Sequence, residues 1–199
     1  MRFFWGELQF KSIVRRDGRV ATRNYIGVLS TVNCSVSVAR FISESFTSDS
    51  LAEFPNVDGV VSLGHGTGCA MVPDGEGFVL LQRTLAGYAR HPNFAGILLV
   101  GLGCEVNQMD CLFENMHLKQ GPLLRAIEIQ KAGGTQETVR QGVASIREML
   151  AEANHVERHH VPASHLVLAL ECGGSDAYSG ISANPALGVA VNLLVKNGG

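Results

Sequence analysis

Short apolar runs without alternation are the feature that most constrains the fold of this chain. Residues 96–100 and 165–170 are dominated by Val, Ile and Leu, and such runs are typical of strands buried on both faces. We expect strands over residues 25–29, 59–63, 96–100, 126–129 and 165–170. Longer stretches with apolar residues at helical spacing follow them, over residues 34–46, 77–89, 106–117, 136–154 and 185–195.

Strands that alternate with helices indicate β-α-β units and a parallel sheet. The sequence therefore predicts an α/β, three-layer domain with a mainly parallel sheet of about five strands, flavodoxin-like or Rossmann-like. Residues 1–24 are more polar and contain the turn signal Arg15-Arg16-Asp17-Gly18-Arg19. We expect them to form an N-terminal arm or small hairpin, with residues 25–199 as the α/β domain.

Composition excludes several classes of protein. The chain has 199 residues, 46% of them hydrophobic, and a net charge of −2, so it lacks the basic stripe of a nucleic-acid-binding protein. Its apolar runs have about strand length, far below the roughly 18 residues of a membrane helix. The apolar run at the start breaks too early for a secretory signal. We therefore expect a cytoplasmic protein that binds neither nucleic acid nor membrane.

Polar and glycine-rich segments follow four of the five expected strands. Ligands of an open parallel sheet bind at the carboxyl ends of its strands, and these segments lie there, over residues 30–35, 64–69, 101–108 and 171–176. Glycine lets a ligand approach the backbone, and a helix amino terminus attracts carboxylates as well as phosphates. None of the segments has a convincing phosphate-binding or dinucleotide fingerprint.

Each of the four segments contributes one cysteine. The five cysteines lie at positions 34, 69, 104, 111 and 172, without the C-x-x-C pair of a zinc ribbon or the even number of a secreted disulfide framework. Cys111 falls inside an expected helix, where we expect it to pack. The other four are candidates for ligating an iron–sulfur cluster or a softer divalent metal. The alternative is that small residues are needed where strands enter tight turns.

His65, Glu105 and Asp176 add harder ligands and a possible base to the same edge of the sheet. Among the protein side chains, histidine has the unperturbed pKa that lies nearest to physiological pH. His65 stands between Gly64 and Gly66 at an expected strand end, a position that favours a functional role over a structural one.

Several motifs resemble the altronate/galactarate dehydratase family, and they occur in the family's order over roughly residues 14–199. They include residues 32–35, 64–69 and 101–108, and most specifically Glu171-Cys172-Gly173-Gly174-Ser175-Asp176 followed by residues 179–185. The resemblance implies a lyase that removes water from a sugar acid with a divalent metal, iron(II) or manganese(II). It also implies that this chain is a fragment of a longer enzyme, without its C-terminal domain, which forms a homo-oligomer or joins a small N-terminal-domain subunit.

The resemblance and the loop positions together suggest a role for each candidate residue. We expect His65 to be the catalytic base or a metal ligand. The candidate metal ligands are Cys34, Cys69, Cys104, Glu105 and Cys172. The candidate substrate-binding residues are Asn33, Ser35, Thr67, Asn107, Gln108, Gly173, Gly174, Ser175 and Asp176.

Three other functions remain open at this point. A related lyase that acts on a sulfonated or other short hydroxy acid, of the sulfolactate type, would use the same loops. A module that binds a sugar acid without turnover would also retain them. The α/β pattern alone would also suit a nucleotide-binding oxidoreductase domain.

Overall fold

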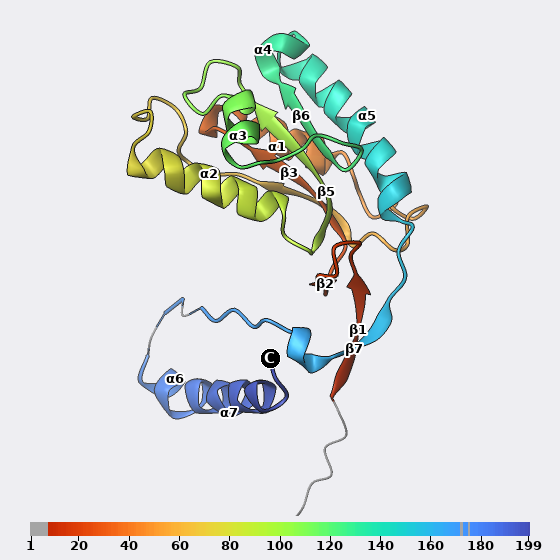
Figure 1. The fold of residues 1–199 in the computed structure, drawn as a ribbon, viewed down its shortest axis with the longest axis vertical. Helices are drawn as coiled ribbons and strands as arrows, with labels where there is room; N and C mark the ends of the chain where they lie inside the picture. Colours follow the sequence, from red (N-terminus) through yellow and green to blue (C-terminus); the bar gives the residue numbers. More distant parts are fainter. Residues whose placement is uncertain (1–7, 172, 175) are drawn as a thin grey trace, which may run out of the picture. The chain divides into compact units, whose positions relative to one another are not determined.

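The computed structural model describes residues 8–171, 173–174 and 176–199 (Figure 1). These residues form two compact units. One contains the described residues up to Val20 together with Arg158–Gly199, and the other is Ala21–Glu157. The expected division into an arm over residues 1–24 and a domain over residues 25–199 stays a prediction.

The larger unit contains a four-stranded parallel sheet. Its strands are β3 (Tyr25–Ser30), β4 (Gly59–Leu63), β5 (Phe94–Gly101) and β6 (Leu124–Glu128), in the order β4-β3-β5-β6. All three neighbouring pairs are parallel. The predicted α/β class and parallel sheet are confirmed, and β3 and β5 occupy the centre of the sheet.

Helices cover both faces of this sheet. This coverage explains why its strands consist of continuous apolar runs and do not alternate apolar with polar residues. Leu98 and Val100 of β5 belong to a core cluster with residues of α1 (Val36–Glu44) and α5 (Thr135–Ala153). Ile97 and Leu99 belong to a second cluster with residues of α2 (Glu76–Ala89) and α3 (Met109–Asn115). Successive side chains of a strand point to opposite faces, so both faces of β5 require apolar residues. The short helix α4 (Ile129–Ala132) follows β6.

The expected fifth strand over residues 165–170 is wrong. This segment has no strand structure, and its side chains are largely exposed; Val167 is 91% exposed. An apolar run forms a buried strand only where neighbouring strands and helices cover it. Among the described residues, no strand pairs with this segment.

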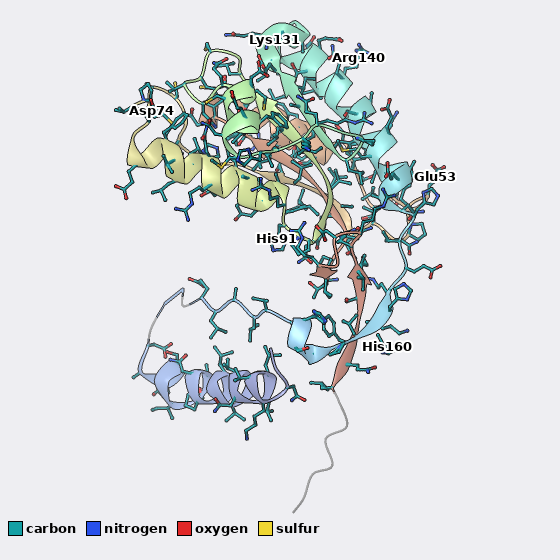
Figure 2. All side chains as sticks on the ribbon, in the orientation of Figure 1. Glu53, Asp74, His91, Lys131, Arg140 and His160 are labelled. Carbon is teal, nitrogen blue, oxygen red and sulfur yellow. The ribbon has the colours of Figure 1, made fainter. Side chains whose placement is uncertain are left out.

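The smaller unit consists of a small sheet and two helices. Its strands β1 (Gln9–Val14) and β7 (His159–Pro162) are antiparallel. The two-residue strand β2 (Val20–Ala21), whose second residue is counted with the larger unit, pairs with the other side of β1. The polar turn between β1 and β2 is closed by Arg15 N–H, which donates to Arg19 O at 2.8 Å. His160 is exposed on β7 (Figure 2).

The 3-10 turn η2 (Ala163–His165) follows β7. Helices α6 (Ala177–Ile181) and α7 (Ala183–Lys196) complete the smaller unit and contain no buried residue. Among the helices that the structure describes, none combines the length and the apolar character needed to cross a membrane.

Gly142 brings α5 close to α1. A Cβ atom at position 142 would lie 2.9 Å from Cγ1 of Ile42, which is fully buried.

We predict that Gly142→Ala lowers the free energy of unfolding by about 1–3 kcal/mol, because overpacking a closed core costs that much. The exposed Gly87 of α2 has open space around it. Gly87→Ala should therefore raise stability by roughly 0.5–1 kcal/mol. Urea unfolding followed by circular dichroism measures both, and equal effects would contradict the account.

Candidate functional site

The loops after β3 and β4 lie against each other at the carboxyl edge of the sheet. Asn33 N–H donates to Thr67 O at 2.8 Å. Gly68 has a φ of +99°, and a Cβ there would lie 2.9 Å from Thr31 O. Only glycine adopts this conformation without strain and allows such a close approach. The two loops are therefore held in contact by a hydrogen bond and by the absence of a side chain.

Three of the four predicted thiols gather at this edge. Cys34, Cys69 and Cys104 come from the loops after β3, β4 and β5, and all three are exposed. The Cys34 thiol donates to Asn33 Oδ1 at 3.4 Å. Cys69 and Cys104 lie within electrostatic range of it. Partial desolvation, together with the charges that Cys69 and Cys104 carry as thiolates, raises the pKa of Cys34. The loops that carry these three residues share one sheet edge, and the predicted role of the residues as metal ligands stays a prediction.

The two remaining cysteines differ from these three. Cys111 lies half-buried on α3, where its sulfur accepts a hydrogen bond from Asn115 Nδ2 at 3.3 Å. This agrees with the packing role expected for it. Cys172 lies outside the described residues, so its predicted role as a metal ligand stays a prediction.

His65 links its own loop to the end of β3 through Nε2, and its Nδ1 makes a contact within that loop. Its Nδ1 accepts from Thr67 N–H at 3.3 Å, and its Nε2 lies 3.1 Å from Ser30 O. A backbone N–H only donates and a carbonyl oxygen only accepts, so the neutral ring carries its proton on Nε2. The basic nitrogen is Nδ1, whose contact with Thr67 is the longer of the two.

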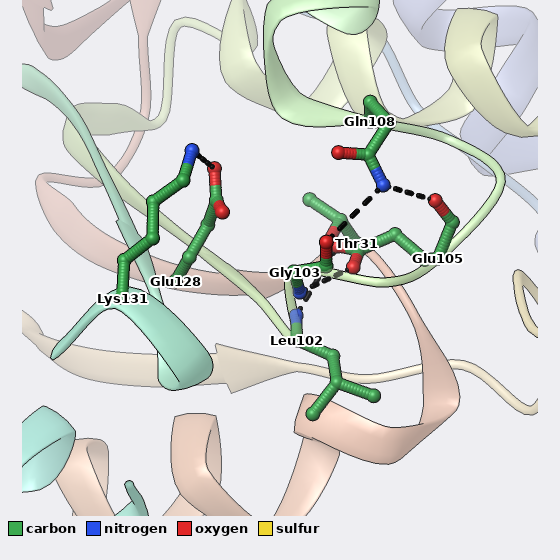
Figure 3. A network of polar contacts seen from close by, with 7 residues as sticks. All are labelled: Thr31, Leu102, Gly103, Glu105, Gln108, Glu128 and Lys131. Atoms are coloured by element: carbon green, nitrogen blue, oxygen red, sulfur yellow. Dashed lines mark hydrogen bonds and ion pairs between the residues drawn. The ribbon is translucent and has the colours of Figure 1, made fainter. Parts of the chain in front are cut away.

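Glu105 holds the loop after β5 in place (Figure 3). One carboxylate oxygen accepts from Thr31 Oγ1 at 2.9 Å and from Leu102 N–H at 3.1 Å, and the other accepts from Gly103 N–H at 2.5 Å. The residue is only 5% exposed. Its oxygens are thus occupied by donors of the protein, which makes Glu105 a positioning residue for the Cys104 loop.

Asn107 belongs to a buried network of amides that sequence reasoning missed. Gln82 of α2 donates to Asn107 Oδ1 at 2.9 Å and accepts from Asn115 Nδ2 at 3.0 Å. Asn107 Nδ2 is buried without a hydrogen-bond partner among the described residues. An unpaired buried donor is costly unless a ligand or water satisfies it. A polar Gln82 between the core residues Leu81 and Leu85 was the signal available in the sequence.

The other predicted substrate-binding residues of this unit fall into two groups. Asn33 and Thr67 are exposed at the edge. Ser35 is fully buried, with its hydroxyl 2.7 Å from Val100 O, and Gln108 donates through Nε2 to Glu105 O. The first pair is available to a ligand, whereas the second pair has hydrogen-bond partners within the protein.

The loop over residues 171–176 belongs to the smaller unit. Gly173 and Gly174 are exposed. Asp176 caps the short helix α6, because its Oδ1 accepts from Ser179 N–H at 2.7 Å. Ser175, like Cys172, lies outside the described residues. The substrate-binding roles of this loop stay predictions.

Two cavities border the carboxyl edge. One of about 560 Å³ lies between β4 and α2, with His65 and Thr67 in its wall beside mainly apolar residues. The other, of about 330 Å³, lies at the end of β6 and is lined by Asp110, Glu128 and Lys131 among others.

In this second cavity the Lys131 ammonium lies 2.9 Å from the Glu128 carboxylate (Figure 3). The hydrogen bond between them is the main reason why the pKa of Lys131 is raised. Sequence reasoning missed this pair, although a charged Glu128 inside the apolar run over residues 126–129 was a signal in the sequence.

Within residues 8–171, 173–174 and 176–199, no three His, Cys, Asp or Glu side chains are arranged to hold a metal ion together. The three thiols are neighbours, but Glu105 is turned toward its own loop. The described residues alone therefore do not fit a complete metal site.

Comparison with known proteins adds to this geometry. Residues 12–154 match the sequence model of the second domain of D-galactarate dehydratase/altronate hydrolase. The chain belongs to this family. Residues 163–199 match the family's separate C-terminal model, D-galactarate/altronate dehydratase. The apolar run over residues 165–170 thus lies in the segment matched by a different family domain from the parallel sheet.

Three curated relatives share most of this chain. It is 32% identical over 190 residues to the altronate dehydratase of Bacillus subtilis (strain 168), covering 96% of this chain and 37% of that protein. It is 35% identical over 195 residues to the galactarate dehydratase (L-threo-forming) of Escherichia coli (strain K12), covering 95% and 37%. It is 28% identical over 185 residues to the (2R)-sulfolactate sulfo-lyase subunit beta of Chromohalobacter salexigens, covering 92% and 43%. The chain thus spans less than half the length of each relative.

The Glu105 network yields a stability prediction. Glu105→Gln replaces one accepting oxygen by an NH2 group that faces backbone donors. We predict a loss of about 1–3 kcal/mol in the free energy of unfolding, the usual cost of leaving buried donors unpaired. Glu114→Gln, at an exposed position of α3, is the matched control and should stay within about 0.5 kcal/mol. Urea unfolding measures both, and an unchanged midpoint for Glu105→Gln would exclude the positioning role.

Proposed function

We propose that this chain supplies active-site loops of a dehydratase that removes water from a sugar acid such as altronate or galactarate, giving a 2-keto-3-deoxy acid. The observation that carries the proposal is that the loops which carry Cys34, Cys69, Cys104 and His65 follow neighbouring parallel strands at one sheet edge. It occurs in a chain that is 32% identical over 96% of its length to an altronate dehydratase.

The proposed reaction begins with the proton on the carbon next to the carboxylate, which is poorly acidic. A positioned base must remove it, and the hydroxyl on the neighbouring carbon must leave as water. The enol that results rearranges to the keto acid. The chain therefore has to provide a base, donors for the substrate's oxygens and a fixed substrate position.

His65 is the proposed base. The Nε2 contact with Ser30 O fixes the ring and its tautomer, so Nδ1 is the nitrogen that accepts the substrate proton. To do so, Nδ1 exchanges its 3.3 Å contact with Thr67 N–H for the substrate. The carbonyl of Ser30 can accept from Nε2–H in the neutral and in the charged ring, so the ring can keep its orientation while Nδ1 takes up the proton.

Asn107 is the proposed donor to a substrate oxygen, because its buried Nδ2 lacks a partner in the described part of the chain. Asn33 and Thr67 are exposed at the same edge and are proposed to bind hydroxyl groups. We assign Ser35 and Gln108 an indirect part in substrate binding, through the loops that they hold. Roles for Gly173, Gly174, Ser175 and Asp176 are proposed from the resemblance alone.

A divalent metal enters the proposal through the family resemblance. When bound, it would supply Lewis acidity at the substrate's oxygens. Cys34, Cys69, Cys104 and Cys172 are the proposed ligands, with Glu105 positioning the Cys104 loop. Thiolates suit iron better than manganese, which prefers oxygen ligands. The donor set therefore favours iron(II) over manganese(II), and an iron–sulfur cluster is the alternative with the same ligands.

A second candidate is a lyase acting on a sulfonated hydroxy acid. The observation that favours it is the 28% identity over 185 residues to the sulfolactate sulfo-lyase subunit beta. A module that binds sugar acids without turnover is the remaining alternative. A cytoplasmic location and assembly with identical subunits or a small N-terminal-domain subunit stay predictions.

A substrate panel separates these candidates. The full-length protein should be assayed with altronate, galactarate and sulfolactate, with and without a chelator and re-added iron(II) or manganese(II). We predict a 2-keto-3-deoxy product from a sugar acid, lost on chelation and restored best by iron(II). Sulfite release would favour the second candidate instead. Binding without turnover, by the full-length protein in the presence of metal, would contradict the dehydratase.

Substitution of His65 tests the proposed base. We predict that His65→Ala in the full-length enzyme lowers kcat about 10²–10⁴-fold with a smaller change in KM, the usual range for a lost general base. Added imidazole should restore part of this activity, which a purely structural role would not allow. The exposed His155→Ala is the matched control and should retain normal kcat. Near-normal kcat for His65→Ala would exclude this assignment.

A further inference from the structure

Cys34 and Cys69 are placed for chemistry with each other as well as with a ligand. They lie on loops joined by the 2.8 Å hydrogen bond between Asn33 N–H and Thr67 O. Gly68 permits this approach, since any side chain there would meet the backbone of Thr31 and Val32 at 2.9 and 3.0 Å. The backbones of two separate loops are thus held in contact within two residues of each cysteine.

Both thiols are also accessible. Cys34 and Cys69 are exposed, and the two side chains lie within electrostatic range of each other. Cys111 provides a contrast, because it is only half-exposed and its sulfur is 3.3 Å from Asn115 Nδ2 and 3.7 Å from Gln82 Nε2. Oxidation selects thiols that have thiolate character, are exposed and have a second thiol in reach. Cys34 and Cys69 meet the last two conditions, whereas the raised pKa of Cys34 slows the first step of oxidation at that sulfur.

We propose that Cys34 and Cys69 are a redox modification site, which a peroxide converts into a reversible disulfide between the loops after β3 and β4. In the first step one thiolate attacks a peroxide oxygen, the O–O bond breaks and hydroxide leaves, so that the sulfur is oxidised to a sulfenic acid. In the second step the other thiolate attacks that sulfur and displaces a second hydroxide. The two protons from the thiols complete two molecules of water, and the peroxide is reduced.

The disulfide has a consequence for the proposed active site. It removes two candidate metal ligands and ties the His65 loop to the Asn33 loop. Reduction by a dithiol restores both thiols, so turnover should stop reversibly. This consequence rests on the proposed function, whereas formation of the disulfide does not.

The test uses the 199-residue chain with Cys172→Ser, so that four cysteines remain. The chain is treated with hydrogen peroxide, excess oxidant is removed by catalase, and free thiols are alkylated before digestion with trypsin. Trypsin cleaves after Arg40 and Arg90, so Cys34, Cys69 and Cys104 fall on three different peptides. We expect loss of two thiols and a linked Cys34–Cys69 peptide pair that dithiothreitol releases.

Matched variants sharpen the result. Cys34→Ser should abolish the linked pair, whereas Cys111→Ser should leave its yield unchanged. Circular dichroism checks that each variant is folded. A disulfide joining any other pair, a link between two molecules, or oxidation to sulfinic acid without a disulfide overturns the proposal.

Activity is measured separately on the full-length enzyme. Loss of turnover by peroxide and its recovery with dithiothreitol support the regulatory consequence. A disulfide that forms in an enzyme without sugar-acid dehydratase activity leaves the modification site intact and overturns only the proposed function.

Discussion

Burial of β3 and β5 on both faces is the constraint on which the rest of the larger unit depends. Side chains such as Leu98 and Leu99 enter separate cores, so neither face of these strands is available to a ligand. Ligands are left with the ends of the strands, and in a parallel sheet the carboxyl ends share one edge. Thiols that are far apart in sequence, such as Cys34 and Cys104, meet there for this reason.

At that edge, polar side chains form hydrogen bonds with the protein's own backbone. The Glu105 carboxylate accepts from two backbone N–H groups of the Cys104 loop, and His65 links the loop that carries Cys69 to the end of β3. A rigid frame of this kind is what precise positioning of a substrate requires. It leaves the thiols and the Asn107 amide as the groups that lack strong internal partners in the described residues. The same rigidity places Cys34 and Cys69 within reach of each other.

Much of this arrangement could be predicted from the sequence, and the exceptions have physical causes. Apolar runs and helical spacing predicted β3 to β6, because these signals are local in the sequence. The positions of the three thiols directly after expected strands predicted that their loops share one edge, because the carboxyl ends of parallel strands lie on the same side of a sheet. The run over residues 165–170 has the same composition, but burial depends on neighbours that a local pattern does not contain. Glu105 was expected to bind metal, but its carboxylate accepts hydrogen bonds from Thr31, Leu102 and Gly103. These contacts depend on the folded conformation of the loop, which the sequence pattern does not contain. Gln82 acts through tertiary contact with Asn107, which no spacing reveals.

The central claim is that the loops after β3, β4 and β5 form one substrate site. The most direct measurement is a crystal structure of the full-length His65→Ala variant with galactarate or altronate bound. The account predicts substrate oxygens within hydrogen-bond distance of Asn107 and the Asn33–Thr67 pair, beside the three thiols. A substrate bound in a site that contacts none of these three loops would contradict it.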